Sequence, residues 1–363
     1  VSHVIPSLTG SELYQQTLAQ HTIELYRKMY LHKTTTLSQV PTRKVYLTDS
    51  EWIALVHRNL QGLTAKDLPY RAIGIKGQAV FTMKDYEKLT ENVNVTLPLH
   101  QQLTQMQTVL ERTLKRRLNK FFMSEKAKAV YESMNAMQIE VSMKDVETKS
   151  EAEYFQVLGQ KVFEKEVLEV TQQVEMFAFV DIAYLVQKWM PQAKARRQEL
   201  EKMDNAPIPL KKIEGSRLQV TAEGIRLLQY VATRVTPVRD YVGYSHLFID
   251  EVQDVSLLWL GTLSNFYFRA KFTVVGDTYQ SFTTSSSIFT LEARHPELVE
   301  LVFPNRTLTN RSLEISYRCT AQITRFANGI LKWPLDKNVF PRTGSEVTLY
   351  SDADGMQLTR LKG

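Results

Sequence analysis

Apolar residues recur at helical spacing through much of the first half of the chain. From residue 99 to residue 168 the pattern predicts a long helical region, because one stripe of large apolar side chains recurs every three or four positions: Leu103, Met106, Leu110, Leu114, Leu118 and Phe121. Thr48 with Glu51, and Thr82 with Asp85, each follow a short apolar run and have the spacing of a capping box. The first half is therefore predicted to be mainly helical, with a short strand before each of the two capped helices.

In the second half, short apolar runs predict strands that alternate with helices. Residues 247–249 and 272–275 are two such runs, and continuous apolar runs fit parallel strands that are covered on both faces. Asp254 is expected to be the N-cap of a helix between them, which gives a strand–helix–strand unit. A helix over residues 224–234 is predicted before this unit. A last helix is predicted after it, with an apolar face made of Ile323, Phe326, Ala327 and Ile330.

Adjacent carboxylates stand at the end of the first of these strands. In open α/β sheets, ligands bind beyond the carboxyl ends of the strands, where Asp250 and Glu251 would project. Asp250 suits Mg²⁺, which takes one or two carboxylates and keeps several waters. Glu251 suits the polarisation of a water molecule for attack on a γ-phosphate. The alternative for the pair taken alone is an acidic strand end without a chemical role.

Three segments of this region resemble, in order and spacing, motifs of the superfamily 1 helicases of the UvrD/Rep class. Residues 250–254 resemble the second motif (Walker B), residues 275–281 the third and residues 313–328 the fourth. The resemblance implies an α/β fold of the P-loop NTPase type, with a RecA-like parallel sheet interrupted by an inserted, mainly helical domain. It also implies ATP and Mg²⁺ as cofactors, and ATP hydrolysis as the activity of the intact protein.

The resemblance implies a role for each residue that matches a motif. Asp250 would bind Mg²⁺, Glu251 would be the catalytic base, and Gln280 would sense the γ-phosphate. Tyr317 would stack on the adenine, and Arg318 would reach the γ-phosphate from a second RecA-like domain, since a planar, always-charged guanidinium suits phosphoryl oxygens. Two further carboxylates of these motifs are expected to contribute to nucleotide binding: Asp254 and Asp277.

The phosphate-binding loop of such motors, G-x-x-x-x-G-K-[ST], occurs nowhere in the sequence. The nearest approaches, residues 74–77 and 214–216, lack its spacing and the Ser or Thr that follows its lysine. Because the sequence begins at Val1 and ends at Gly363, soon after the fourth motif, we expect a fragment whose phosphate loop lies upstream and which is inactive alone. A degenerate ATPase that never had the loop is the alternative.

The expected layout resembles the HelD family within this class. HelD proteins have a UvrD-like motor, carry an insertion inside the first RecA-like domain and bind bacterial RNA polymerase. Here residues 1–45 and 176–312 would form the first RecA-like domain, residues 46–175 the inserted domain, and residues 313–363 the start of the second RecA-like domain. The resemblance implies a monomeric, cytoplasmic ATPase that recycles RNA polymerase.

Two other functions remain open at this point. In unwinding relatives the third motif continues into Trp and Arg residues that stack on single-stranded bases. Here Gln280 and Ser281 are followed by Phe282 and by no Trp, and Phe282 could stack on one base. The first alternative is a UvrD-type helicase that translocates on and unwinds DNA. The second is a non-catalytic interaction module that kept the fold of a motor.

Charge and composition add a candidate contact surface. Opposite the long apolar stripe lies a basic stripe, here called the basic face, which consists of Arg112, Lys115, Arg116 and Lys120. It is either a solvated helix face or a contact with nucleic acid or an acidic protein surface. The net charge of +6 suits a polyanionic partner. The single cysteine, Cys319, suits the cytoplasm, and no run approaches the roughly 20 apolar residues of a membrane span.

Overall fold

The computed structural model describes residues 3–6, 16–17, 35–37, 45–143, 148, 150–200, 206–212, 218–237, 244–277, 288–289, 296–313, 315 and 317–348. The chain divides into two compact units, residues 1–305 and residues 306–363, and each is described by itself. The domain boundaries expected after residues 45, 175 and 312 stay predictions.

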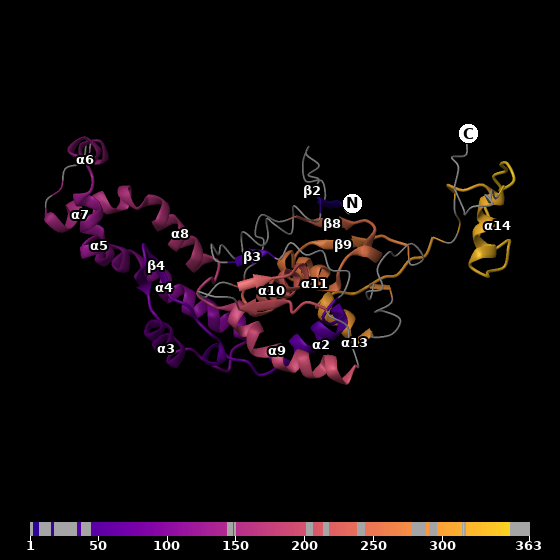
Figure 1. Ribbon diagram of the computed structural model, residues 1–363, viewed down its shortest axis with the longest axis horizontal. Helices are drawn as coiled ribbons and strands as arrows, with labels where there is room; N and C mark the ends of the chain where they lie inside the picture. The colour runs from indigo at the N-terminus through magenta and orange to yellow at the C-terminus, as the bar shows by residue number, and fades with distance from the viewer. Residues whose placement is uncertain are drawn as a thin grey trace. The chain divides into compact units, whose positions relative to one another are not determined.

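The helices predicted between residues 99 and 168 are present in the first unit and continue to residue 175 (Figure 1). The longest, α4, packs against α7 and α8 and also contacts α5. All six residues of the predicted apolar stripe are buried along α4, so the helical spacing identified the inward face correctly. The helices of this region are α4 (Leu99–Phe122), α5 (Glu125–Glu132), α6 (Ala136–Met143), α7 (Glu151–Val162) and α8 (Glu164–Glu175).

Both predicted capping boxes open a helix. Before α2, the Thr48 hydroxyl accepts from the Glu51 N–H at 3.4 Å, and the Glu51 carboxylate accepts from the Thr48 N–H at 2.6 Å. Before α3, the Asp85 carboxylate accepts from the N–H and the hydroxyl of Thr82, each at 2.8 Å. These bonds satisfy groups that the first turn of a helix leaves without partners. The two helices are α2 (Asp49–Leu60) and α3 (Met83–Glu91).

A β-hairpin precedes α3. Strands β4 (Ile73–Ile75) and β5 (Gln78–Phe81) pair antiparallel, as the apolar run before Thr82 predicted for the second of them. Lys76 and Gly77 form the turn with φ values of 47° and 76°. Of the two segments that came nearest to a phosphate-binding loop, residues 74–77 therefore contain a hairpin turn, and residues 214–216 lie outside the described residues. Lys76 is ion-paired with Glu166 at 2.7 Å.

Helices α10 and α11 lie in the core of the rest of the first unit. α10 contacts α2, α9 and α11, while α11 also contacts α2 and α13. Every residue of α11 is buried, including the polar Thr262, Ser264 and Asn265, as expected of a helix in the core. The helix predicted over residues 224–234 is confirmed as α10. The bounds are α9 (Ile182–Glu199), α10 (Ala222–Val235), α11 (Leu257–Phe266) and α13 (Pro296–Val302).

The predicted strand–helix–strand unit is present. Strands β8 and β9 are parallel neighbours, with His246 opposite Lys271 and Ile249 opposite Val274, and α11 lies between them in sequence. They belong to a four-stranded sheet in the order β2-β1-β8-β9, in which β1 runs antiparallel to both β2 and β8. The strands are β1 (His3–Pro6), β2 (Gln16–Thr17), β8 (His246–Ile249) and β9 (Lys271–Val274).

A second sheet has the order β3-β7-β6, with β3 parallel and β6 antiparallel to β7. In both sheets, the described strands pair in parallel and in antiparallel, and they do not form the continuous parallel sheet of a RecA-like domain. That RecA-like sheet stays a prediction. The three strands are β3 (Thr35–Leu37), β6 (Leu210–Lys212) and β7 (Leu218–Val220).

The segment before α2 corrects one expectation, because residues 45–47 do not form a strand. Their N–H groups bond to a buried carboxylate instead: Glu223, in the first turn of α10, accepts from Tyr46 N at 2.9 Å and from Leu47 N at 3.3 Å. It also accepts from Trp52 Nε1 at 2.6 Å. Arg197 of α9 donates to the Tyr46 carbonyl at 2.9 Å. Two helices distant in sequence thus hold this segment.

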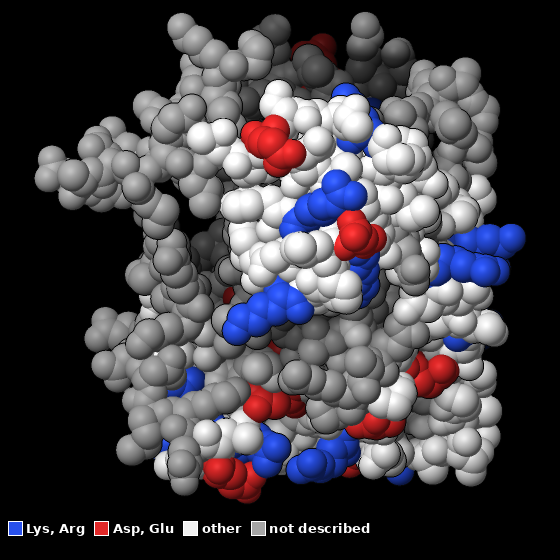
Figure 2. Space-filling view, turned by 90° about the vertical axis from the view of Figure 1, so that its right-hand side faces the viewer, with Lys and Arg blue, Asp and Glu red and all other residues white. Residues whose placement is uncertain are grey.

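The second unit contains α14 (Ala321–Ile330), at the yellow end of the chain in Figure 1. Its described residues bury a single apolar side chain, that of Ala321, together with the polar Thr324 and Asn328. The predicted apolar face of the helix is exposed, and Ile330 is 67% exposed. Among the described residues in Figure 2, basic and acidic side chains are interspersed with uncharged ones.

Candidate functional site

The predicted carboxylates lie at the carboxyl end of β8. Leu247 and Ile249 are buried in this strand, and Asp250 and Glu251 follow as exposed residues. Phe248 is 40% exposed, so the strand is not covered on both faces as its apolar run predicted. The Phe248 ring stacks on His246 with a centroid distance of 4.3 Å, which shields part of its surface.

Glu251 has an unusual backbone conformation. Its φ of 53° and ψ of 40° place it in the left-handed region, which costs a non-glycine residue about 1–3 kcal/mol. The bonds around it hold this geometry. Glu251 N–H donates to Asp250 Oδ1 at 2.9 Å, and Val252 N–H donates to the Val275 carbonyl at 3.0 Å. Residues held in this region concentrate at functional sites. Glu251 is also the residue that was predicted to be the catalytic base.

Gln253 joins the ends of the two parallel strands. Its amide nitrogen donates to Glu251 Oε2 at 2.7 Å, and its amide oxygen accepts from Asp277 N–H at 3.0 Å. The side chain of Gln253 is 2% exposed, whereas its partners Glu251 and Asp277 are exposed and half-buried. One buried amide therefore links the loop after β8 to the loop after β9.

Gly276 makes room for this link. A Cβ at position 276 would overlap Gln253 Oε1 and would lie 3.0 Å from Val252 Cγ1. The glycine is needed here because the two loops approach closely. A larger residue would displace the amide of Gln253 from between Glu251 and Asp277.

Asp254 has a different place from the predicted one. It ends a short 3₁₀ turn, η3 (Val252–Asp254), and its N–H donates to the Glu251 carbonyl at 3.0 Å. The N-cap residue of α11 is Ser256, but the acceptor for the first turn is a side chain from another helix. Asp49 of α2 accepts from Leu257 N–H at 2.7 Å and from the Ser256 hydroxyl at 2.6 Å. A local cap was the wrong expectation, because a carboxylate 208 positions away in sequence takes that role.

The other predicted site residues fall into three groups. Asp277 is described at the end of β9, whereas Gln280 and Phe282 lie outside the described residues. Tyr317 and Arg318 belong to the second unit and are both exposed. The Tyr317 ring lies 4.8 Å from that of Phe340 (between centroids), and the Arg318 carbonyl accepts from Arg342 at 3.5 Å. The structure thus places Asp250 and Glu251 directly after β8 and links Glu251, through Gln253, to the backbone of Asp277 after β9.

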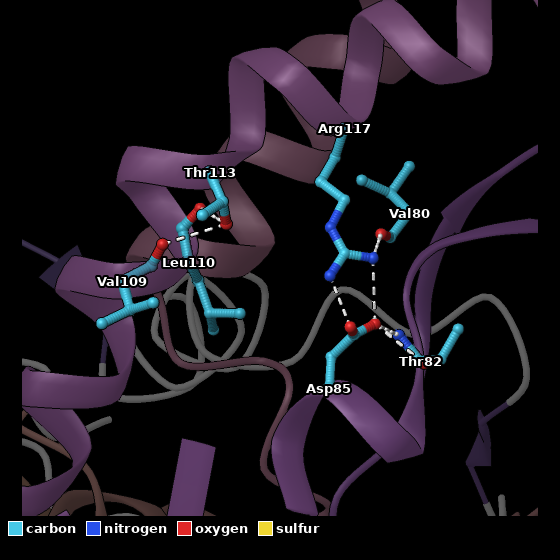
Figure 3. A network of polar contacts seen from close by, with 7 residues as sticks. All are labelled: Val80, Thr82, Asp85, Val109, Leu110, Thr113 and Arg117. Atoms are coloured by element: carbon cyan, nitrogen blue, oxygen red, sulfur yellow. Dashed lines mark hydrogen bonds and ion pairs between the residues drawn. The ribbon is translucent and has the colours of Figure 1, made fainter. Parts of the chain in front are cut away.

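The basic face of α4 is exposed at all four positions. Arg117, inside the same run, behaves differently: it forms an ion pair with Asp85 of α3 and also donates to the Val80 carbonyl at 3.5 Å (Figure 3). Its guanidinium lies 5.5 Å from the centre of the Phe81 ring. Arg117 is therefore a structural residue that joins α4 to the hairpin and to α3, whereas the four basic-face residues are available to solvent or a partner.

An open groove of about 500 Å³ runs beside this face, between α4 and α7. Leu114, Leu118 and Val157 supply its apolar lining, and Lys115 of the basic face and Lys161 lie at it as well. Glu111 and three amide side chains complete the lining, which is therefore apolar and polar with charges of both signs.

Two pKa shifts mark the buried or half-buried carboxylates. Burial raises the pKa of Glu223, and the N–H groups of Tyr46, Trp52 and Leu47 offset part of that effect. Burial also acts to raise the pKa of Asp85, but the hydrogen bonds from Arg117 and Thr82 outweigh it, so that the pKa of Asp85 is lowered. Glu223 thus resists ionisation, and Asp85 favours it.

Comparison with known proteins adds no further evidence on the function. The sequence matches no protein-family model, and no curated protein is significantly similar to it. Within the described residues, none of the helices combines the length and the apolar character needed to span a membrane. The same part of the chain contains no cluster of three or more His, Cys, Asp or Glu side chains suited to hold a metal ion.

Proposed function

We propose that the chain carries part of the hydrolytic site of an ATP-dependent, superfamily 1 helicase-like motor of the HelD type, which binds and recycles bacterial RNA polymerase. The observation that carries this proposal is the end of the β8–β9 pair. Two exposed carboxylates follow one parallel strand, the second is held in a strained backbone geometry, and Gln253 links it to the strand beside it.

In this proposal Asp250 holds Mg²⁺. The residue fits, because it is exposed at the end of β8, and its Oδ1 accepts from the N–H of the next residue. Mg²⁺ prefers carboxylate oxygens and needs only one or two of them. When bound, the ion neutralises charge on the phosphate oxygens. Asp277 is a further polar contact for the nucleotide at the same edge of the sheet.

Glu251 is the proposed general base. Its Oε2 accepts from Gln253, which leaves the other oxygen to orient a water molecule and take its proton as the water attacks the γ-phosphate. A base of this kind contributes about 10²–10⁴-fold to a rate. The roles of Gln280, Tyr317 and Arg318 stay predictions of the resemblance, as do a RecA-like sheet and a phosphate loop supplied by another segment of the intact protein.

The partner surface in this proposal is the basic face of α4. Its side chains are exposed, and the α4–α7 groove beside them has a partly apolar lining. We propose that an acidic surface of RNA polymerase binds here, in the cytoplasm. DNA is the alternative partner, because four exposed cations on one helix face also suit a phosphate backbone. Strand-displacement assays and polymerase capture distinguish the two.

The test of the hydrolytic site is Glu251→Gln in the full-length protein. The substitution preserves shape and removes the base, so ATP hydrolysis should fall by about 10²-fold or more while nucleotide binding stays nearly intact. Steady-state hydrolysis and fluorescent-nucleotide binding measure the two effects. Arg318→Ala should likewise slow hydrolysis more than it weakens binding. An unchanged turnover number in Glu251→Gln would remove Glu251 from its role and the hydrolytic proposal with it.

A further inference from the structure

The amide of Gln253 is oriented by both of its bonds. The nitrogen can only donate and the oxygen can only accept, and the structure places a carboxylate oxygen on one side and a backbone N–H on the other. A flip of the amide would place its oxygen against the Glu251 carboxylate and its nitrogen against the Asp277 N–H. Because the side chain is 2% exposed, a flipped amide would be buried without suitable partners, which is costly.

The two partners of this amide belong to different strands. Glu251 lies directly after β8, whereas Asp277 follows β9, and the strands pair in parallel up to Ile249 and Val274. Two backbone hydrogen bonds continue the pairing just beyond the strands. Val275 N–H donates to the Ile249 carbonyl at 2.8 Å, and Val252 N–H donates to the Val275 carbonyl at 3.0 Å. Beyond these bonds, Gln253 supplies the cross-strand link.

The donor bond acts on the side chain of Glu251 and not on its backbone. Glu251 is exposed, and the side chain of an exposed glutamate ordinarily samples several rotamers. A buried donor at 2.7 Å fixes one carboxylate oxygen and thereby limits where the other can point. Restriction of this kind matters for a base that must meet a water molecule in one orientation.

We infer that Gln253 is a positioning residue that aims the carboxylate of Glu251 and ties its position to the loop after β9. This inference rests on the proposed function for its catalytic consequence, but the bridge itself can be tested without nucleotide. Displacement of the Asp277 backbone would pull on the same amide that holds Glu251. The loop after β9 and the orientation of the base are therefore mechanically linked.

The variants that test this bridge separate its two bonds. Gln253→Met keeps an unbranched side chain of similar size and loses both bonds. Gln253→Glu keeps an acceptor for Asp277 N–H but has no donor for the Glu251 carboxylate. Gln102→Met is the matched control: Gln102 of α4 is 1% exposed, and its amide also bonds on both sides, to Ala65 N–H at 2.9 Å and to the Leu97 carbonyl at 2.7 Å.

The first measurement is amide hydrogen exchange at Asp277 in the 363-residue chain, without nucleotide. We expect exchange to quicken on the order of 3- to 10-fold in Gln253→Met, the effect of one lost hydrogen bond, and to stay near the wild-type rate in Gln253→Glu and Gln102→Met. Unchanged exchange at Asp277 in Gln253→Met would overturn the bridge.

The second measurement is ATP hydrolysis by the full-length protein. Gln253→Met and Gln253→Glu should both lower kcat on the order of 10-fold with less than about a threefold change in KM, because the lost interaction orients a base and does not bind substrate. Gln102→Met should leave kcat and KM unchanged. If Glu251→Gln abolishes hydrolysis while both Gln253 variants match the wild type, the positioning role is wrong and the hydrolytic proposal stands. If Glu251→Gln hydrolyses normally, the hydrolytic proposal fails, whatever the exchange at Asp277 shows.

Discussion

The two units of this protein differ in what holds them together. In the first unit, buried apolar side chains line α4, α10 and α11, and the buried carboxylate of Glu223 accepts hydrogen bonds among them. In the described residues of the second unit, Ala321 is the only buried apolar side chain. Polar contacts hold the segments of that unit: the amide of Asn328 donates to the carbonyls of Leu335 and Lys337 at 2.9 and 2.8 Å.

The second unit leaves apolar side chains exposed that the first unit would bury. Hydrophobic burial stabilises a fold by about 25 cal/mol for each Å² removed from water, and the second unit has little of it. Its apolar side chains, among them Ile323 and Ile330, are exposed at 45% and 67%. A segment held mainly by polar bonds is expected to open more easily than one with an apolar core. The strained Glu251 is found in the unit whose core can offset its cost.

The largest contrast should come from truncating one large aliphatic side chain in each unit. Leu110→Ala in α4 removes a side chain that is 1% exposed and should lower the free energy of unfolding by about 3 kcal/mol. Ile330→Ala in α14 should change it by less than about 0.5 kcal/mol, because the side chain is largely exposed already. Urea denaturation of the two variants measures both. Equal losses would mean that the second unit has a core like that of the first.

A somewhat smaller effect is expected at Glu223. Glu223→Ala leaves three buried N–H donors without their acceptor and should cost about 2 kcal/mol, and Glu223→Gln less, since one oxygen remains. Because burial raises the pKa of Glu223 above its ordinary 4.5, the folded state holds this proton more tightly than the unfolded state. Stability should therefore fall as the pH rises above 4.5, and this part of the slope should vanish in Glu223→Gln. A slope identical to that of the wild type would contradict the assignment.

Arg117 and Arg116 give a sharper comparison within one helix. Arg117→Ala breaks the ion pair with Asp85 and should cost about 1 kcal/mol, whereas Arg116→Ala at the exposed neighbouring position should cost almost nothing (Figure 3). Since the pKa of Asp85 is lowered, this contribution is present above its ordinary value of 3.8 and is lost as the pH falls through the lowered value. Thermal unfolding of both variants at neutral and at acidic pH measures it. A loss in Arg117→Ala that persists at acidic pH would assign its effect to packing on Phe81.

The smallest effect on stability is expected from the basic face. Reversal of Arg112, Lys115, Arg116 and Lys120 to Glu should leave the free energy of unfolding within about 0.5 kcal/mol for each substitution, because all four are exposed. In the full-length protein the same reversal should weaken polymerase binding in a salt-dependent manner and leave basal ATP hydrolysis unchanged. Binding measured over a range of salt concentrations tests this. Unaltered affinity at low salt would make the basic face a solvated surface.

The candidate site could be predicted in part. The adjacent carboxylates after an apolar run, and the second run that follows, were sufficient to place Asp250 and Glu251 beside the end of β9, as the structure does. Gln253 escaped prediction, because a glutamine two positions after a glutamate carries no signal until the pairing of β8 with β9 is known. The same holds for Gly276, whose need for space depends on Gln253.

What the sequence determined by itself was local. The capping boxes at Thr48 and Thr82 join residues three apart, and the stripe of α4 recurs every three or four positions, so short-range geometry was enough. Tertiary structure decided the rest. Residues 45–47 are apolar enough for a strand, yet their N–H groups bond to Glu223, and α11 takes its cap from Asp49. In both cases a distant carboxylate satisfies backbone groups that cannot be left unpaired when buried, and no local pattern records which distant residue will do so.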